Sequence, residues 1–519
     1  MPKISLTSMK HDMVRYVTLS HCCKFIDVVW VHNLLQDSVT GITSMIPKTF
    51  QDSVWGDTST ILTTTKGTIE QRIRGISFRD LPTTFQDAVQ ITRALGIRYL
   101  WIDSLCIVQD DKDDWEIESA KMAEIYLGSC LTIAATASFD SSGGFFFNRW
   151  TSQPGGMRTD VETFEFHRTF HGMNFTIYAR QGLDSGHQRI SGCASTSTNT
   201  APLLQRAWAY QERMLAPRML HVHMEEMFWE CRCCTICECG YFSWESEHSN
   251  RNEWSPMGGN MALKSRIALA ADGATSVEDT QKMWLDIVEE YSMLALTKES
   301  DRLPALSGLA KSLSHRVQAS YLAGLWENNI VIGLLWHRCS VVYSSCFRDK
   351  FSVVPSWSWA SVIRNPKSTG KTNDLNHITY DEVRGGIMQD PRLKILSATC
   401  QVTSNNPFGE VSGGTLTIEG ALIIAKYAFP PHAARPQVLH GTEASEVHTD
   451  IWHPREPAEL LEGEMVFCLL FGMSRFNFAG HALVLKAVDA NIYRRVGYMN
   501  LDSRMTWFDD VIPFVVNII

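Results

Sequence analysis

The fold is decided by a part of the sequence that begins Leu81-Pro-Thr-Thr-Phe-Gln-Asp-Ala-Val-Gln-Ile-Thr-Arg-Ala-Leu95-Gly96. Its apolar residues recur mostly three or four apart, as on one face of a helix. Asp87 follows Thr84 by three residues, which resembles the capping box at a helix start. Gly96 is a typical helix stop. The stretch therefore predicts a helix that ends before Gly96.

A strand, a second helix and a further strand are expected after this helix. Arg98-Tyr-Leu-Trp-Ile102 is largely apolar and ends at Asp103, which favours a buried parallel strand. After a polar turn at 109–113, Asp114 is expected to cap the second helix. Leu131-Thr-Ile-Ala-Ala-Thr136 then predicts another strand.

The sequence on both sides extends this pattern. Upstream, Tyr16-Val-Thr-Leu-Ser20 is rich in β-branched and bulky residues and predicts a short buried strand. Downstream, 206–215 predicts a helix, 219–230 a strand and 277–296 a helix. Strands that alternate with helices indicate a three-layer α/β domain built on a parallel sheet.

Beyond Trp326 the chain changes to short apolar or alternating runs separated by Gly and Pro. The clearest runs are 353–362, 416–425, 465–471 and 482–488. Such runs are typical of an antiparallel β-rich module. We therefore expect an α/β domain over 14–245, a helical linker over 246–325 and a β-rich region over 326–519.

Composition narrows the class of protein. The chain has 519 residues, 45% of them hydrophobic, and a net charge of −9 with no basic block, which argues against a nucleic-acid partner. The N-terminus lacks the apolar region of a signal peptide. No apolar run approaches the roughly 20 residues that a membrane-spanning helix needs. We expect a soluble, cytoplasmic protein whose 14 cysteines are reduced thiols.

Five of these cysteines lie in Cys231-Arg-Cys-Cys-Thr-Ile-Cys-Glu-Cys239, after two histidines, His221 and His223, on one face of the preceding strand. Cys234 and Cys237 have the spacing of a zinc-binding pair, but no second pair follows at a suitable distance. We therefore expect no metal, and we interpret the cluster as thiols packed in a strand turn.

Several segments resemble, in order, the blocks of fungal heterokaryon incompatibility (HET) domains. Tyr16-Val-Thr-Leu-Ser-His-Cys22 resembles their opening motif, and 81–107 resembles their central block. Arg206-Ala-Trp208 with Gln211-Glu212 resembles their closing block. Further stretches are similar to the extensions of Het-6/Tol-like members, namely Asp301–Leu309, Ala323–Trp326, Pro355–Ser361 and Tyr493–Gly497.

The resemblance implies both a fold and a function. HET domains trigger growth arrest or death when incompatible fungal strains fuse, and the trigger would be another protein or self-association. Their distant similarity to TIR domains implies a TIR/flavodoxin-like sheet and makes the protein a candidate NAD glycohydrolase, with NAD as substrate and no required cofactor. A third hypothesis is a catalytic or accessory role in a secondary-metabolite gene cluster.

The opening motif departs from the family pattern in one respect. The pattern expects Trp-Gly directly after Ser-His-Cys, whereas here Trp55-Gly56 is the first such pair. Because long loops inside compact α/β domains are uncommon, we expect an insertion at 23–54, from a retained intron or a gene-model error. The alternative is a real inserted loop.

Candidate ligand-binding residues follow the first two predicted strands, because ligands of parallel α/β sheets bind beyond the carboxyl ends of the strands. Ser20 follows the first strand, and Asp103 with Ser104 follows the second. Asp103 could bind a ribose hydroxyl, or it could cap the loop that starts at Ser104. A Ser–His or Cys–His nucleophile at 20–22 is disfavoured, because adjacent strand residues point to opposite faces.

On the second helix, Trp115 and Glu118 match the catalytic arrangement of TIR domains loosely. The Glu118 carboxylate would stabilise the positive charge that develops on the ribose as nicotinamide leaves. The alternative is a solvated residue favoured by the helix dipole. Arg206 could bind phosphate or carboxylate, or it could tie its helix to the sheet through a buried ion pair.

Overall fold

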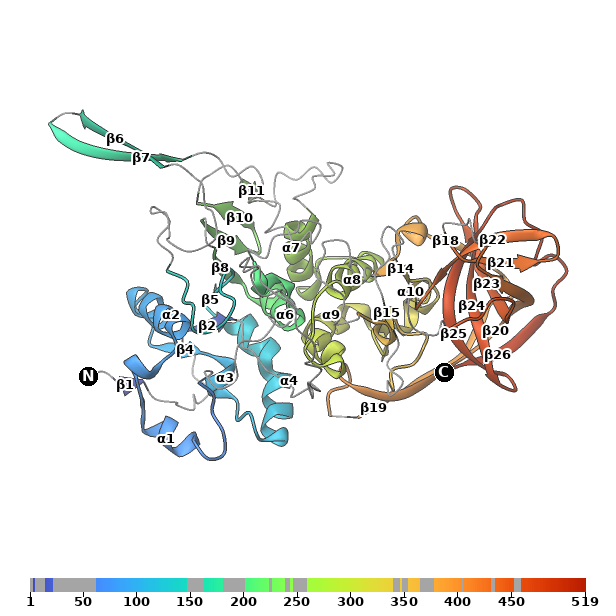
Figure 1. Cartoon of the computed structure of the whole chain (residues 1–519), viewed down its shortest axis with the longest axis horizontal. Helices are drawn as coiled ribbons and strands as arrows, with labels where there is room; N and C mark the ends of the chain where they lie inside the picture. Colours follow the sequence, from blue (N-terminus) through green and yellow to red (C-terminus); the bar gives the residue numbers. More distant parts are fainter. Residues whose placement is uncertain are drawn as a thin grey trace, which may run out of the picture. The chain divides into compact units, whose positions relative to one another are not determined.

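The computed structural model divides into two compact units, 1–265 and 266–519, which Figure 1 colours along the sequence. The structure describes residues 3–4, 15–21, 62–146, 163–170, 172–180, 201–223, 226–238, 243–245, 259–338, 346–347, 353–364, 378–403, 405–430, 435–451 and 459–519. The insertion expected at 23–54 and the Trp-Gly pair at 55–56 lie outside the described residues.

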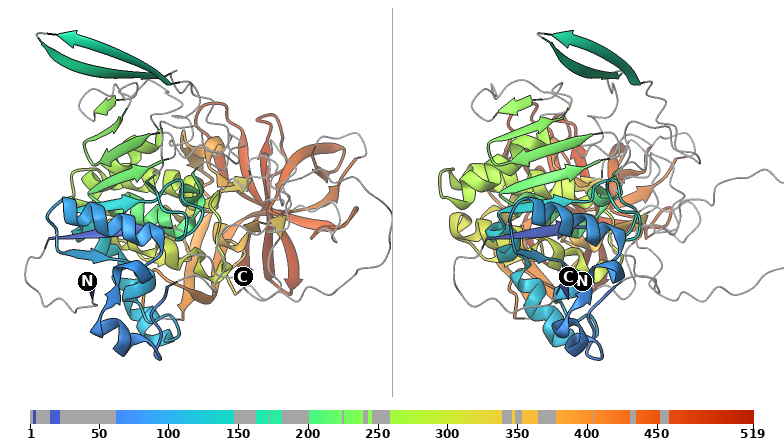
Figure 2. Two further views of the ribbon diagram at one scale, coloured as in Figure 1. Left: turned by 60° about the vertical axis from the view of Figure 1, so that its left-hand side comes forward. Right: turned by 90° about the vertical axis from the view of Figure 1, so that its left-hand side faces the viewer.

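The first unit is built on a seven-stranded sheet in the order β11-β10-β9-β8-β5-β2-β4 (Figure 2). These strands are β2 (Tyr16–Ser20), β4 (Tyr99–Trp101), β5 (Leu131–Ala134), β8 (Arg218–Val222), β9 (Met227–Cys231), β10 (Cys234–Cys237) and β11 (Ser243–Glu245). β2 is parallel to β4 and β5, and β5 is parallel to β8, whereas the other neighbours are antiparallel. The predicted parallel α/β sheet is confirmed for β2, β4, β5 and β8. They lie side by side in the order β4-β2-β5-β8, so the second strand along the chain comes first, followed by the first, the third and the fourth.

Helices cover both faces of this sheet. The helices described up to residue 271 are α1 (Ile69–Arg74), α2 (Thr83–Ala94), α3 (Asp103–Cys106), α4 (Lys112–Gly128), α6 (Ala207–Leu215) and α7 (Gly259–Ala271), of which α2 and α6 pack on opposite faces. Side chains alternate between faces along a strand. On one face, Val17 and Leu19 of β2 pack with Phe85 of α2 in a buried apolar cluster. On the other face, Ala134 of β5 packs with Ala209 of α6.

The start of α2 differs from the predicted capping box. The helix begins at Thr83 with no side-chain cap. Asp87 does not reach back to the helix start, because its carboxylate accepts the backbone N–H groups of Phe145 and Phe146 at 2.8 and 3.3 Å. Asp87 therefore fixes a distant loop, and Gly96 ends the helical region with a φ of 67°, as expected.

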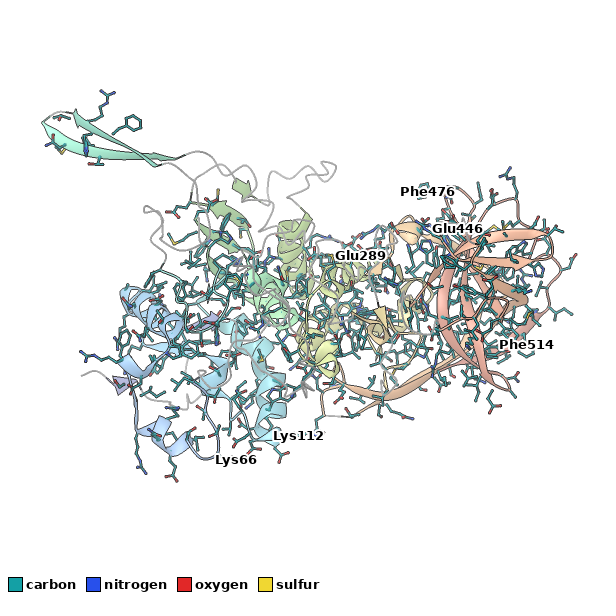
Figure 3. The ribbon with its side chains drawn as sticks, viewed as in Figure 1. Lys66, Lys112, Glu289, Glu446, Phe476 and Phe514 are labelled. Carbon is teal, nitrogen blue, oxygen red and sulfur yellow. The ribbon has the colours of Figure 1, made fainter. Side chains whose placement is uncertain are left out.

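The start of α4 also differs. The helix begins at Lys112, and Asp111, not Asp114, caps it by accepting two backbone N–H groups. Asp114 instead accepts the Val108 N–H at 2.8 Å. Lys66, labelled with Lys112 in Figure 3, forms an ion pair with Asp111 at 3.2 Å. Several neighbouring aspartates are suitable helix caps by sequence, and tertiary contacts determine that Asp111 is the cap.

Two strand predictions in this unit are corrected. The predicted strand at 219–230 is a hairpin of β8 and β9, in which Val222 lies opposite Met227. β4 is parallel as predicted but lies at the sheet edge, where its residues are only half-buried. Two further pairs of strands in this unit are β1 (Lys3–Ile4) with β3 (Ile76–Ser77) and β6 (Thr163–Phe170) with β7 (Met173–Arg180).

The second unit combines helices with a nine-stranded, almost entirely antiparallel sheet. The helices are α8 (Val277–Ser292), α9 (Ser307–Val317) and α10 (Ile330–Gly333). The sheet strands are β18 (Ile387–Gln389), β19 (Lys394–Val402), β20 (Val411–Ala428), β21 (Gln437–His440), β22 (Glu443–Thr449), β23 (Met465–Ser474), β24 (Gly480–Asp489), β25 (Ile492–Leu501) and β26 (Pro513–Ile518). Two-stranded pairs are β12 (Tyr321–Leu322) with β13 (Leu325–Trp326), β14 (His337–Arg338) with β17 (Ile378–Thr379), and β15 (Cys346–Phe347) with β16 (Ile363–Arg364). The predicted β-rich module is confirmed.

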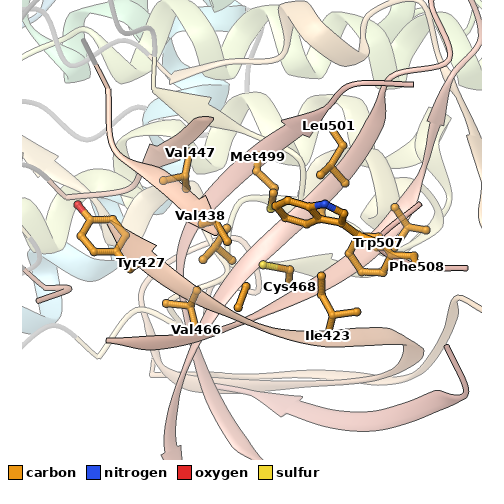
Figure 4. Packing of buried hydrophobic residues seen from close by; sticks show 14 of the residues in the cluster. Ile423, Tyr427, Val438, Val447, Val466, Cys468, Met499, Leu501, Trp507 and Phe508 are labelled. Atoms are coloured by element: carbon orange, nitrogen blue, oxygen red, sulfur yellow. The ribbon is translucent and has the colours of Figure 1, made fainter. Parts of the chain in front are cut away.

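The sheet of the second unit encloses an apolar core (Figure 4). Val466 and Cys468 of β23 and Val438 of β21 are fully buried there, and Trp507 belongs to the same buried cluster. Burial of apolar surface on this scale is the main source of stability of such a sheet. No described helix of either unit is long and apolar enough to cross a membrane.

Two of the family-like stretches downstream of residue 300, Pro355–Ser361 and Tyr493–Gly497, meet inside the second unit. The Arg495 guanidinium is fully buried, forms an ion pair with Asp450 at 3.2 Å and donates to the backbone carbonyls of Leu334 and Trp336. Its backbone N–H donates to the Ser356 hydroxyl at 3.0 Å. Because these donor groups of Arg495 are hydrogen-bonded to acceptors within the chain, these stretches form a structural junction.

The run at 353–362 is not the predicted strand. Trp359–Ser361 forms a short 3₁₀ helix capped by the Ser358 hydroxyl, which accepts the Ala360 N–H at 3.1 Å. Trp357 and Trp359 are buried, and the Trp359 indole donates to the Gly324 carbonyl at 3.1 Å. The two indoles therefore belong to the core of the second unit.

Candidate functional site

Polar side chains gather where the first two parallel strands end. Ser20 is the last residue of β2, and Asp103 follows β4 as the first residue of α3. His21 is buried directly after Ser20, and its Nδ1 lies 3.7 Å from Oδ1 of Asp103. Asp103 also accepts the backbone N–H of Ser104 at 2.6 Å. The residues predicted at the two strand ends therefore lie together.

Glu212 of α6 lies at the centre of this group. The Tyr126 hydroxyl, from α4, donates to the Glu212 carboxylate at 2.9 Å, and both side chains are buried. Burial raises the pKa of Glu212 to about 7, and the negative charge of Asp103 contributes to the rise. The nearby Ser20 hydroxyl, the charge of Arg206 and the hydrogen bond from Tyr126 act in the opposite direction. Glu212 is therefore poised to change protonation near neutral pH.

Arg206 links α6 to the end of β2. It is buried at the N-cap of α6, and its guanidinium donates to the backbone carbonyl of His21. Burial lowers the pKa of His21, and the positive charge of Arg206 adds to that effect, whereas Asp103 opposes it. The His21 ring also packs edge-on against Phe85 at 4.8 Å. Arg206 therefore fixes the backbone next to Ser20 while supplying positive charge to the group.

Ser104 offers a hydroxyl that no described residue binds. The residue is only 4% exposed, and no described residue forms a hydrogen bond with its Oγ. A buried hydroxyl without a partner carries a cost that a bound ligand or water can relieve.

Trp115 and Glu118 lie on α4, apart from the contacts around Glu212. The Glu118 carboxylate forms an ion pair with Lys121 at 2.8 Å, and Trp115 packs edge-on against Trp208 of α6 at 6.3 Å. Among the described residues, no hydrogen bond or ion pair joins Glu118 to Glu212 or Asp103. Burial raises the pKa of the Cys106 thiol to about 11, and Glu118 is close enough to add to that rise.

The importance of Glu212 is not evident from the sequence, although the residue lies within the family-like closing block. The available signal is an acidic residue on a short helix, 207–215, that also carries several apolar side chains. A carboxylate on such a helix is costly unless it is paired or neutral. Only the fold shows that this carboxylate lies beneath the ends of β2 and β4.

A second buried ionic group lies next to α6. Glu230 of β9 receives hydrogen bonds from Arg213, the residue after Glu212, at 2.9 to 3.2 Å and accepts one from His221 at 2.9 Å. Lys264 lies 3.9 Å from the same carboxylate. Burial alone would raise the pKa of Glu230, but the positive charges of Arg213 and Lys264 hold it well below its usual range. This group joins α6, β8, β9 and α7.

None of the described side chains form a group of three or more His, Cys, Asp or Glu residues that could hold a metal ion. His221, which the sequence placed near the cysteine cluster, instead bridges Glu230 and the Thr136 hydroxyl, the latter at 3.1 Å.

Comparison with known proteins identifies the first unit. Residues 53–212 match the family model described as Heterokaryon incompatibility protein (HET). The match contains β4, β5, α2 and α4 and ends at Glu212, whereas β2 precedes it and nevertheless pairs with β4 and β5. No curated protein and no solved structure matches the chain significantly. The chain therefore contains a HET domain, which lies in the α/β unit that carries Glu212.

Proposed function

We propose that this protein is a cytoplasmic effector of fungal heterokaryon incompatibility, which arrests growth or kills the cell after non-self recognition. The HET match over residues 53–212 carries this proposal, because it implies involvement in heterokaryon incompatibility. Recognition would come from another protein or from self-association, and the second unit offers a separate folded body for that contact.

A specific observation favours an enzymatic mode of action as the second proposal. Glu212, Asp103 and Ser20 gather at the carboxyl ends of β2 and β4, next to the point where the strand order reverses between β2 and β5. Ligands of doubly wound sheets bind at such switch points, and the order second-first-third-fourth is the beginning of the flavodoxin-like arrangement. Perturbed carboxylates also concentrate at functional sites. We infer that the site cleaves NAD.

In this mechanism the chain's own residues stabilise charge at the ribose. The ionised Glu212 carboxylate holds a ribose hydroxyl and stabilises the positive charge that develops at C1 as nicotinamide leaves. Asp103 binds a second hydroxyl, and the Ser104 hydroxyl donates to the ligand. Arg206 and Tyr126 act as positioning residues, because they hold Glu212 and the end of β2 in place. Glu118, with Trp115 beside it on α4, stays the alternative catalytic carboxylate.

Inducible expression of the full chain in a fungal host tests both proposals. The effector proposal predicts growth arrest or death after induction, and the enzymatic proposal predicts that cellular NAD falls before growth stops. Growth arrest with constant NAD would remove the enzymatic proposal and leave the effector proposal standing. Normal growth of cells that accumulate folded protein, both alone and with an incompatible strain, would contradict the effector proposal.

A further inference from the structure

Two cysteines face each other across the turn that joins β9 to β10. Cys231 ends β9 and Cys234 begins β10, and their Sγ atoms lie 3.5 Å apart. Glu230 pairs with Thr235 in this hairpin, so the next opposed pair is Cys231 with Cys234. Opposed residues of antiparallel strands have Cα atoms about 4.5–5.5 Å apart, which lies within the range that a disulfide bridges. A bond between the two sulfurs therefore needs only side-chain rotation.

Cys231 also has the surroundings of a reactive thiol. The backbone N–H of Cys234 donates to Sγ of Cys231 at 3.3 Å. Partial burial acts to raise the pKa of Cys231, but hydrogen bonds from Cys233, Cys234 and Trp229 together outweigh it and lower the pKa. Cys231 and Cys234 are both partly exposed. Burial instead raises the pKa of Cys400 and of Cys468 to about 12. Reactivity of a cysteine follows its thiolate fraction and its exposure, so Cys231 is the nucleophile of this hairpin.

Positive side chains next to the hairpin favour a thiolate there. Lys264 is buried and its charge interacts with that of the Cys231 sulfur. Arg232 forms the turn itself, together with Cys233. Cationic neighbours are a recurring feature of cysteines that oxidise selectively. The short distance between the two sulfurs and the neighbouring positive charges thus both favour reaction at the Cys231 sulfur.

We propose that Cys231 and Cys234 form a reversible intramolecular disulfide, which makes the β9–β10 hairpin an oxidation site of this HET domain. With a hydroperoxide as oxidant, the Cys231 thiolate attacks the peroxide oxygen, which breaks the O–O bond and gives a sulfenic acid and hydroxide. The Cys234 thiol then attacks the Cys231 sulfur, so that the S–S bond forms, the S–O bond breaks, and the thiol proton leaves with the hydroxide as water. Overall, two thiols and one hydrogen peroxide give one disulfide and two waters, and two electrons pass from the sulfurs to the peroxide. A low-molecular-weight thiol reverses the reaction by thiol–disulfide exchange.

The position of the pair gives oxidation a route to the rest of the domain. Glu230, directly before Cys231, is held by Arg213 of α6 at 2.9 Å. Oxidation removes the negative charge of the Cys231 thiolate, which interacts with the positive charge of Lys264. It also links β9 to β10 covalently. The disulfide itself depends only on the hairpin, so the proposal stands apart from the NAD chemistry proposed for Glu212.

Peptide mapping of the full-length protein tests the disulfide. The protein is treated with one equivalent of hydrogen peroxide, alkylated and digested with trypsin. Cleavage after Arg232 separates Cys231 from Cys234, in peptides 219–232 and 233–251. We expect the two peptides to stay linked until dithiothreitol is added, with the link at Cys234. In the reduced protein, we expect alkylation of Cys231 at pH 7 to be at least about tenfold faster than that of Cys400.

Matched variants identify the partner sulfur. Cys233→Ser should leave the link intact, whereas Cys234→Ser should abolish it and leave a sulfenic acid at Cys231 that a cyclic diketone traps. Separate peptides after oxidation of the wild-type protein would overturn the proposal, and so would a link that persists in Cys234→Ser or disappears in Cys233→Ser. Because the wild-type measurement stands alone, a variant that fails to fold does not remove the test.

Discussion

The Tyr126 hydroxyl donates a hydrogen bond to the carboxylate of Glu212 over 2.9 Å, and this bond joins α4 to α6 beneath the end of β2. A buried carboxylate that keeps one donor is partly stabilised in its ionised form, which burial alone would disfavour. The bond therefore helps to set the pH at which Glu212 changes charge.

Removal of the Tyr126 hydroxyl should raise the pKa of Glu212 further above its value of about 7. A hydrogen bond to a charged group contributes about 1.5–3 kcal/mol, so Tyr126→Phe should move the titration upward by about one pH unit or more. The change can be measured by NMR of the labelled Glu212 carboxyl carbon in the full chain. Tyr99→Phe, at the edge of the sheet, is the control, and an equal shift in both variants would contradict the assignment.

Stability of the first unit should fall as pH rises toward neutrality. The folded pKa of Glu212, about 7, lies above its ordinary value of 4.5, so the folded state keeps a proton that the unfolded chain releases. The stabilisation is fully present below pH 4.5 and is lost as pH rises through about 7, with a magnitude on the order of 3 kcal/mol. Hydrogen exchange of β2 and β5 between pH 5 and 8, corrected for intrinsic rates, measures it. Glu212→Gln should flatten this dependence, and an unchanged slope would count against the buried acid.

The buried pair of Glu230 and Arg213 should be necessary for the hairpin of β8 and β9. Glu230→Gln removes the charge that compensates Arg213 and Lys264, and the loss of one partner of a buried pair costs about 3–5 kcal/mol. We expect hydrogen-exchange protection in β8 and β9 to fall by at least about 100-fold. Glu70→Gln is the control, because its pair with Arg74 is exposed and contributes little. Equal effects of the two variants would contradict this prediction.

In the second unit, acid should destabilise the sheet through His481. Its ring accepts or donates a hydrogen bond with the Tyr498 hydroxyl at 2.7 Å, and burial lowers the pKa of His481 to about 4, with a further contribution from His337. Because the folded pKa lies below the ordinary 6.5, stability is complete above pH 6.5 and is lost as pH falls toward 4. Hydrogen exchange of β24 and β25 at pH 7 and pH 5 should show the loss, and His481→Asn should reduce it. The pKa of His448 is also about 4, so protonation of His448 accounts for the loss of stability that remains in His481→Asn. Of the charged groups around these histidines, Asp381 pairs with His337 at 3.0 Å.

The sequence predicted the type and order of the main elements, because apolar periodicity is a local property of the chain. β2, α2, β4, α4 and β5 lie where the pattern placed them. The caps were less predictable, because Asp111 and Asp114 are both suitable and only a contact with Val108 distinguishes them. The hairpin of β8 and β9 was predicted as one strand, since no glycine or proline marks its turn.

The candidate site was predictable in part. The rule that ligands bind beyond strand ends brought Ser20, Asp103 and Ser104 to one edge of the sheet. Glu212 was not found by that rule, because it comes from a helix that lies more than 100 residues after Asp103 and meets the strands only through packing. Pairing of a helix with a sheet face depends on the whole core, and no local pattern reports it.

The central claim is that the carboxylate of Glu212 at the end of β2 is the reactive centre of this HET domain. Release of nicotinamide from NAD by the purified full-length protein at pH 7.5 tests it most directly. We predict turnover by the wild-type protein, a loss of at least about 100-fold in Glu212→Gln and near-normal turnover in Glu118→Gln. Absence of turnover by the wild-type protein, unchanged turnover in Glu212→Gln, or a loss confined to Glu118→Gln would contradict the account.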